Sequence, residues 1–95
     1  MDTKIQLRHP AGKKAINMDI EKYNTIKNAL LQCLNSKGES THAEILQAIT
    51  EDFKIKKIIF VGSVEWHMEW VKLDMEARKE IKRIGDKSPV KFKLA

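Results

Sequence analysis

Four side chains of this sequence are of types that act as nucleophiles, general bases or metal ligands: His9, His42, His67 and Cys33. Nucleophilic catalysis requires a base within hydrogen-bond reach of the nucleophile. Zinc sites usually place pairs of ligands a few residues apart in the chain. No histidine lies three or four residues from another histidine or from the cysteine. The sequence therefore predicts a protein that is not an enzyme and that binds no metal ion or cofactor.

His67 has the most suggestive surroundings of the four, because Trp66 and Trp70 flank it on an expected helix. An imidazole between indoles could bind a small anion or an aromatic ring. The ordinary interpretation is a partly buried histidine that donates to a nearby carbonyl oxygen. Asp74 and Arg78, four residues apart, are interpreted as a surface ion pair of a helix and not as an acid and a base.

Length and composition set the limits for the elements that must position these residues. The chain has 95 residues and a net charge of +5, which predicts one domain over residues 1–95. The longest apolar run is Ile58 to Val61, so no membrane span is expected. The start of the chain lacks the pattern of a signal peptide, and one cysteine cannot form an internal disulfide. We expect a cytoplasmic protein with no membrane partner.

Residues 1–18 alternate between apolar and polar side chains, which is typical of strands. Ile5 and Leu7 form one alternating pair, and Ile16 and Met18 form another. Between them, residues 9–13 include a proline and a glycine, the residues of a reverse turn. This pattern predicts an N-terminal β-hairpin.

Residues 19–80 follow helical periodicity and predict three helices. Asp19 is the expected N-cap of the first helix, which ends at Gly38, and Cys33 is interpreted as a small buried thiol beside its apolar stripe. Thr41 and Glu44 have the spacing of a capping box that begins the second helix. Residues 54–61 fit a short strand, a frayed helix end or a loop packed on the core.

The third helix is expected to begin at Gly62-Ser63 and to face the core with one apolar stripe, formed by Trp66, Trp70, Leu73 and Ala77. The opposite stripe would then face outward and consist of Glu65, Glu69, Lys72 and Glu76. Residues 81–95 alternate again around a glycine- and proline-containing turn, which predicts a C-terminal hairpin.

Three helices with a tight turn after the first, followed by a strand, a turn and a strand, resemble the winged-helix variant of the helix-turn-helix fold. Residues 70–83 look like the third helix and first wing strand of many bacterial winged-helix domains. Residues 7–12, 19–23 and 29–31, with the tryptophan-rich third helix, also resemble a family of small bacterial proteins without an assigned activity. The predicted fold is therefore α+β: a winged-helix-like three-helix core over residues 19–80, a C-terminal β-hairpin wing and an extra N-terminal β-hairpin.

The winged-helix resemblance implies DNA binding, with the third helix in the major groove and the wing on the phosphates. Residues 64–80, however, carry three basic and five acidic side chains, whereas residues 81–95 carry five basic and one acidic. Acidic side chains repel phosphate, so insertion of this helix into the major groove is disfavoured. We expect binding of double-stranded DNA with weak sequence specificity through the two hairpins, by Arg8, Lys13, Lys14, Lys82, Arg83, Lys87, Lys91 and Lys93. Alternatively, these residues are a solvated surface that keeps the protein soluble.

A different feature supports the alternative of a protein-interaction or homodimerisation module. The apolar run at residues 58–61 and a methionine of the third helix offer a surface of the kind that interfaces use, formed by Ile58, Phe60, Val61 and Met68. The same residues can instead fill the core.

Overall fold

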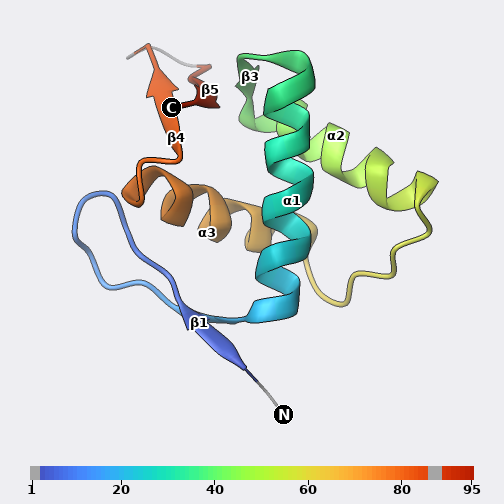
Figure 1. Ribbon diagram of the computed structural model, residues 1–95, viewed down its shortest axis with the longest axis horizontal. Helices are drawn as coiled ribbons and strands as arrows, with labels where there is room; N and C mark the ends of the chain where they lie inside the picture. The colour runs from blue at the N-terminus through green and yellow to red at the C-terminus, as the bar shows by residue number, and fades with distance from the viewer. Residues whose placement is uncertain (1–2, 86–88) are drawn as a thin grey trace.

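The computed structural model describes residues 3–85 and 89–95 and contains three helices with two small antiparallel sheets (Figure 1). The elements in chain order are β1 (Lys4–Gln6), β2 (Asn17–Asp19), α1 (Ile20–Lys37), β3 (Ser40–Thr41), α2 (His42–Ile55), α3 (Val64–Ala77), β4 (Ile81–Ile84) and β5 (Lys91–Leu94). The predicted α+β class, with three helices between two hairpins, is confirmed.

All three helices begin, and α1 ends, at the residues that their capping signals predict. The side chain of Asp19 accepts from the amide of Lys22, and Gly38 ends α1 with a positive φ of 76°. At the start of α2, the Glu44 amide donates to the Thr41 hydroxyl over 3.2 Å, and the Thr41 amide donates to Glu44 over 2.8 Å. Each cap pairs a backbone group that the helix itself leaves without a partner.

Strand pairing joins elements that are distant in sequence. β1 pairs with β2 to form the N-terminal hairpin, and the second sheet has the order β3-β5-β4. In this sheet Arg83 lies opposite Phe92, and Lys82 lies opposite Lys93. The two-residue strand β3 was not expected from the sequence, and it attaches the start of α2 to the wing. The resulting arrangement is consistent with the winged-helix-like fold.

Residues 56–63 form the connection between α2 and α3. The α2 helix ends at Ile55, and Lys57 adopts a positive φ of 56° while the amide of Ile58 donates to the carbonyl of Phe53. Of the three alternatives for residues 54–61, the structure contains a short continuation of α2 followed by a loop. Phe60 of this loop packs against the core, whereas the side chain of the preceding Ile59 is 91% exposed.

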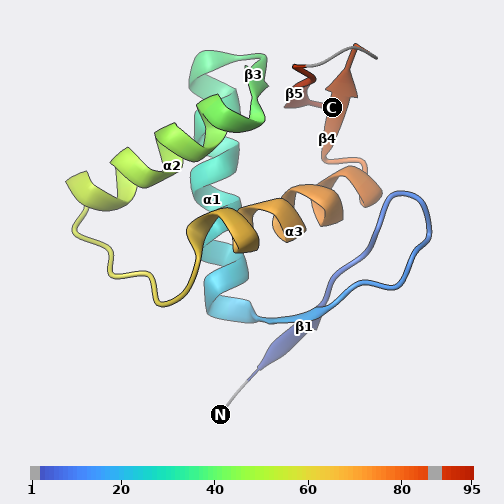
Figure 2. The ribbon, with the colours of Figure 1, turned by 180° about the vertical axis from the view of Figure 1, so that it is seen from behind.

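The core lies where α1 is crossed by α2 and α3, which both pass on the same side of it (Figures 1 and 2). Ile26 and Leu30 of α1 are completely buried, as are Ile45 and Ile49 of α2. Their spacings of four residues place each pair on one face of its helix.

The third helix turns a different face to the core from the one predicted. Trp66 is 49% exposed, and the buried residues are Met68, Val71, Lys72, Asp74 and Met75. The prediction that Trp66 faces inward is therefore wrong, and so is the prediction that Met68 belongs to an exposed interface. Both stripes of this helix carry large apolar side chains, so periodicity alone does not decide between them. The unbranched methionines fill the space against α1 and α2.

Candidate functional site

The outer face of the wing sheet carries lysines that lie opposite one another. Lys82 lies opposite Lys93 in the β4–β5 pair. Lys91 precedes Lys93 by two residues in β5 and therefore lies on the same face of the sheet. Within residues 3–85 and 89–95, none of the three lies within ion-pair distance of a carboxylate. Like charges directly opposite in a sheet are destabilising. This face therefore carries positive charge that forms no direct ion pair with a described carboxylate. The pKa of Glu44 is lowered mainly by its hydrogen bonds to Thr41 and to a smaller extent by the charge of Lys91.

The other wing residues of the predicted site differ from these three. The guanidinium of Arg83 lies 3.0 Å from Glu76 and packs over the ring of Phe92, so it is already engaged within the domain. Lys87 lies outside the residues that the structure describes. The exposed lysines of the wing are consequently Lys82 and Lys91, with Lys93 partly exposed.

A buried carboxylate fixes the first hairpin against α3. Asp74 is completely buried and accepts from the backbone amide of Arg8 over 2.8 Å. It also accepts from the hydroxyl of Tyr23 and from Nε of Arg78, which lies 2.9 Å from Oδ2. The predicted helix pair of Asp74 and Arg78 is therefore present, but the prediction that it lies at the surface is wrong because Asp74 is buried. Asp74 also contacts Arg8 and Tyr23, which lie outside α3. The spacing of residues along one helix does not reveal such contacts.

This anchor places the loop of the first hairpin beside the wing (Figure 2). Arg8, Lys13 and Lys14 are exposed on that loop. A shallow cavity of about 430 Å³ lies between the two hairpins and is lined by Pro10 from the first hairpin, by Lys82 from the second and by Lys79 from the turn that precedes β4. The structure thus brings basic residues from both ends of the chain to one end of the molecule.

The outward face of α3 is acidic and apolar. Glu65 and Glu69 contact the imidazole of His42 at 3.1 and 3.3 Å, and Trp66 is exposed beside them. Lys72, predicted on the outward stripe, is only 3% exposed and points into the domain. Because carboxylates repel phosphate, this face is unsuited to the major groove.

A second candidate surface consists of exposed apolar side chains at the connection between α2 and α3. Ile55 is 80% exposed, Val61 is 70% exposed and Ile58 is 36% exposed. Phe60 is partly buried, since its ring stacks on Phe53 with centroids 5.7 Å apart. Sequence patterns missed Ile55, which lies at the last turn of α2 and so escapes the periodicity of the helix.

Comparison with known proteins assigns the chain to a family. The sequence model of one protein family, the family of unknown function DUF6958, matches residues 4–92. The chain belongs to this family. No curated protein and no solved structure matches the chain. Membership of DUF6958 brings no assigned activity with it.

His67 of this DUF6958 chain has the ordinary surroundings expected for it. Its Nδ1 donates to the carbonyl oxygen of Ser63 over 2.7 Å, which ties it to the turn that begins α3. The ring contacts Phe60 and Trp66 edge-on, with centroids 4.9 Å away in both cases. The imidazole is therefore part of an aromatic cluster that anchors the loop.

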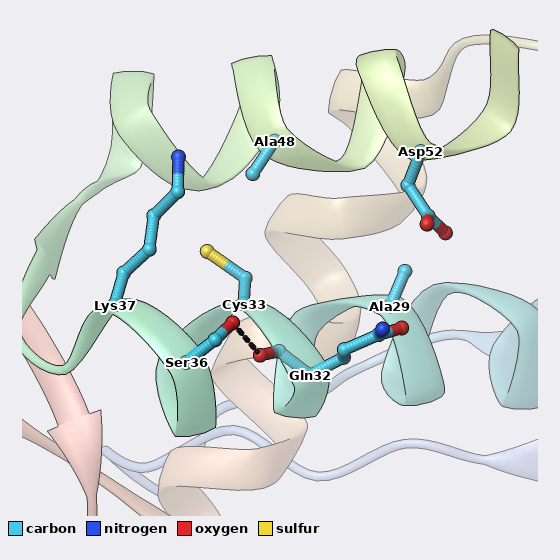
Figure 3. Close-up of a pocket in the computed structure, with 7 residues that line it drawn as sticks. All are labelled: Ala29, Gln32, Cys33, Ser36, Lys37, Ala48 and Asp52. Carbon is cyan, nitrogen blue, oxygen red and sulfur yellow. Dashed lines mark hydrogen bonds between the residues drawn. The ribbon is translucent and has the colours of Figure 1, made fainter. Parts of the chain in front are cut away.

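Cys33 lies at a small cavity of about 140 Å³ between α1 and α2 (Figure 3). The thiol is buried, as predicted, and burial raises its pKa above the ordinary value. A thiol in this state is a poor nucleophile. Within the part of this DUF6958 chain that the structure describes, no three His, Cys, Asp or Glu side chains are grouped so as to hold a metal ion. None of its helices there combines the length and the apolar character that crossing a membrane requires.

Proposed function

We propose that this chain is a non-enzymatic, cytoplasmic winged-helix module that binds double-stranded DNA through phosphate contacts of its two hairpins. The observation that carries the proposal is the lysine face of the wing, formed by Lys82, Lys91 and Lys93, none of which forms an ion pair with a described carboxylate. Like charges that lie opposite one another on a sheet cost stability in the free protein, and a phosphate backbone relieves that cost.

The first hairpin extends this basic surface. Its loop lies beside the wing and adds Arg8, Lys13 and Lys14, which are all exposed. Contacts from loops and strands to phosphates fix orientation without reading bases. Sequence preference should therefore be weak and dependence on salt steep.

The expected salt dependence follows from the number of phosphates that the lysines neutralise. About five phosphate contacts give a slope near −4.5 in log K against log salt, a loss of roughly 500-fold between about 50 and 200 mM salt. Fluorescence anisotropy of a labelled random duplex of about 20 base pairs, titrated at both salt concentrations, measures this slope.

A matched pair of triple variants locates the contact surface. The variant in which Ala replaces Lys82, Lys91 and Lys93 should bind DNA more weakly at low salt. The magnitude of its salt slope should be smaller by the contribution of about three phosphate contacts. The control variant, in which Ala replaces Lys54, Lys56 and Lys57, loses the same charge from the opposite end of the domain. Its salt slope should be nearly that of the wild type. Equal losses in the two variants would show that only net charge matters, and unchanged binding by the wing variant would refute the proposal.

The exposed apolar side chains favour a second candidate function, a protein interface. Ile59 and Val61 are 91% and 70% exposed, and isolated domains seldom leave neighbouring large apolar side chains in water. In its simplest form the partner is a second copy of the chain. Light scattering should then give twice the mass of one chain for the wild type and a single-chain mass for Val61→Asp. A single-chain mass for the wild type would exclude the homodimer.

A further inference from the structure

The exposed apolar side chains of the domain are concentrated in one short stretch of the chain. Among the residues that the structure describes, five large apolar side chains are exposed, and four of these lie within residues 55–61: Ile55, Ile58, Ile59 and Val61. The stretch passes beside the start of α1, at the end of the molecule away from the wing (Figures 1 and 2). Neighbouring apolar side chains of this size mark a surface that a partner covers.

A groove of about 220 Å³ runs between this loop and the first turns of α1. Residues 58–61 line one side of the groove. The α1 side is lined by Asp19, Glu21, Lys22 and Thr25. A second hollow of about 240 Å³ adjoins the groove, because Thr25 and Ile58 line both. Ile59, which is 91% exposed, therefore lies directly beside a hollow on the same surface.

The α1 edge of this surface carries a negative charge in excess. Asp19 and Glu21 line the groove on that side, and Lys22 is the one lysine among the lining residues. Lys22 lies over the ring of Phe60, with its Nζ 5.8 Å from the ring centre. In the part of the chain that the structure describes, the carboxylate of Glu21 forms no ion pair.

The α2 edge carries a positive charge in excess. Its lysines outnumber its carboxylates by one, and the ionisable residues are Glu51, Asp52, Lys54, Lys56 and Lys57. Asp52 holds Lys56 at 3.2 Å. Lys54 and Lys57 are exposed, and no described carboxylate lies within ion-pair distance of either. The surface therefore has an apolar centre between two edges of opposite charge.

A second copy of the chain supplies the complement of every part of this surface. In a twofold-symmetric pair the same surface of two chains meets itself, and a residue at one edge can face the other edge of the partner. An axis through the apolar centre brings the negative edge of each copy to the positive edge of the other. It also brings Ile59 of each copy towards the groove of the other. An apolar centre with a charged rim is the usual anatomy of an interface.

We propose that residues 55–61 and the adjoining groove dock on the same surface of a second copy, with Glu21 of each chain facing Lys54 and Lys57 of the other. The proposal rests on the second candidate function above and names the residues through which the two copies meet. Because the wing lies at the other end of the domain, this contact leaves the lysine face of the wing free (Figure 1).

Charge reversal at the two edges tests the arrangement. Light scattering over a dilution series from about 1 to 200 μM measures self-association, for which we expect a wild-type dissociation constant of about 10 μM. Glu21→Lys and the double variant Lys54→Glu, Lys57→Glu each place like charges at both contacts, so each alone should raise the dissociation constant at least about tenfold. In an equimolar mixture of the two variants, every contact between unlike chains joins opposite charges. The mixture should therefore associate about as well as the wild type.

Two further variants separate this contact from general effects of charge and of apolar surface. Lys13→Glu reverses an exposed charge on the first hairpin, far from the groove, and should leave the dissociation constant unchanged. Ile59→Asp puts a charge at the apolar centre and should give the mass of one chain, alone or mixed with either charge variant.

The possible failures are distinguishable. A single-chain mass for the wild type would overturn both this proposal and the homodimer, and the DNA-binding proposal would still be decided by the anisotropy titrations. Association that Val61→Asp abolishes but that the charge variants and their mixture leave unchanged would overturn this arrangement alone. A single-chain wild type that sediments with vesicles of equal parts phosphatidylglycerol and phosphatidylcholine would assign the surface to lipid and would equally overturn the proposal.

Discussion

Replacement of Asp74 by asparagine tests the central polar contact of the domain. The carboxylate is completely buried and accepts from three elements, through the amide of Arg8, the hydroxyl of Tyr23 and the guanidinium of Arg78. Hydrogen bonds to a charged group contribute about 1.5 to 3 kcal/mol each, and the amide oxygen of asparagine can retain part of them. Losing the charge from a buried pair leaves the other partners undercompensated. We expect Asp74→Asn to lower the free energy of unfolding by about 3 kcal/mol.

A loss of this size is readily measured in a small domain. At roughly 4 to 8 °C per kcal/mol, the melting temperature should fall by about 12 to 24 °C, and urea unfolding should give the same free energy. Asp52→Asn is the matched control, because Asp52 also pairs with a cation four residues on, Lys56, at 3.2 Å but near the surface. Such pairs contribute about 0 to 1 kcal/mol. Equal effects of the two substitutions, or a loss below about 1 kcal/mol for Asp74→Asn, would refute the role given to Asp74.

Three further results are expected. Burial and the hydrogen bond to Asp74 raise the pKa of Tyr23 above its ordinary value of 10.0, so the stability that its neutral hydroxyl contributes is complete below pH 10 and is lost as the pH rises above it. The free energy of unfolding of wild type should therefore approach that of Tyr23→Phe progressively as the pH rises above about 10, and a constant difference between the two proteins there would contradict the shift. Cys33 should react with a thiol reagent only as fast as the domain opens, and immediate labelling in native buffer would show that the thiol is accessible. Thr41→Ala should lower the free energy of unfolding by about 1 kcal/mol through loss of the α2 cap, measured by urea unfolding, and no loss would mean that Glu44 and water replace the hydroxyl.

Local signals were sufficient to predict the order of the three helices and the two hairpins. Caps such as Asp19, Thr41 and Ser63 act within one turn of their own helix, so their spacing reveals the boundary directly. The hairpins were predicted for the same reason, because alternation and turn residues lie within a short stretch. β3 was missed because two residues carry no periodicity, and it exists through pairing with β5 far along the chain.

The candidate sites were less predictable because their residues depend on contacts between distant elements. Lys72 and Asp74 read as ordinary surface charges of an amphipathic helix, and their burial follows from partners on other elements, His42 for one and Tyr23 for the other. A single sequence shows neither pairing. The exposed lysines of the wing were easier to list, since strand alternation places them on the outer face.

The orientation of α3 links the fold to the proposed function. A winged-helix module that reads bases presents polar and basic side chains from its third helix to the major groove. Here the inward face of that helix holds the lysine, and the outward face holds Glu65, Trp66 and Glu69. Rotation of the helix to expose Lys72 would bury both glutamates against the core, at a cost that no described partner offsets. The acidic, aromatic outward face of α3 is therefore unsuited to phosphate, which is why the proposed DNA contacts are placed on the hairpins.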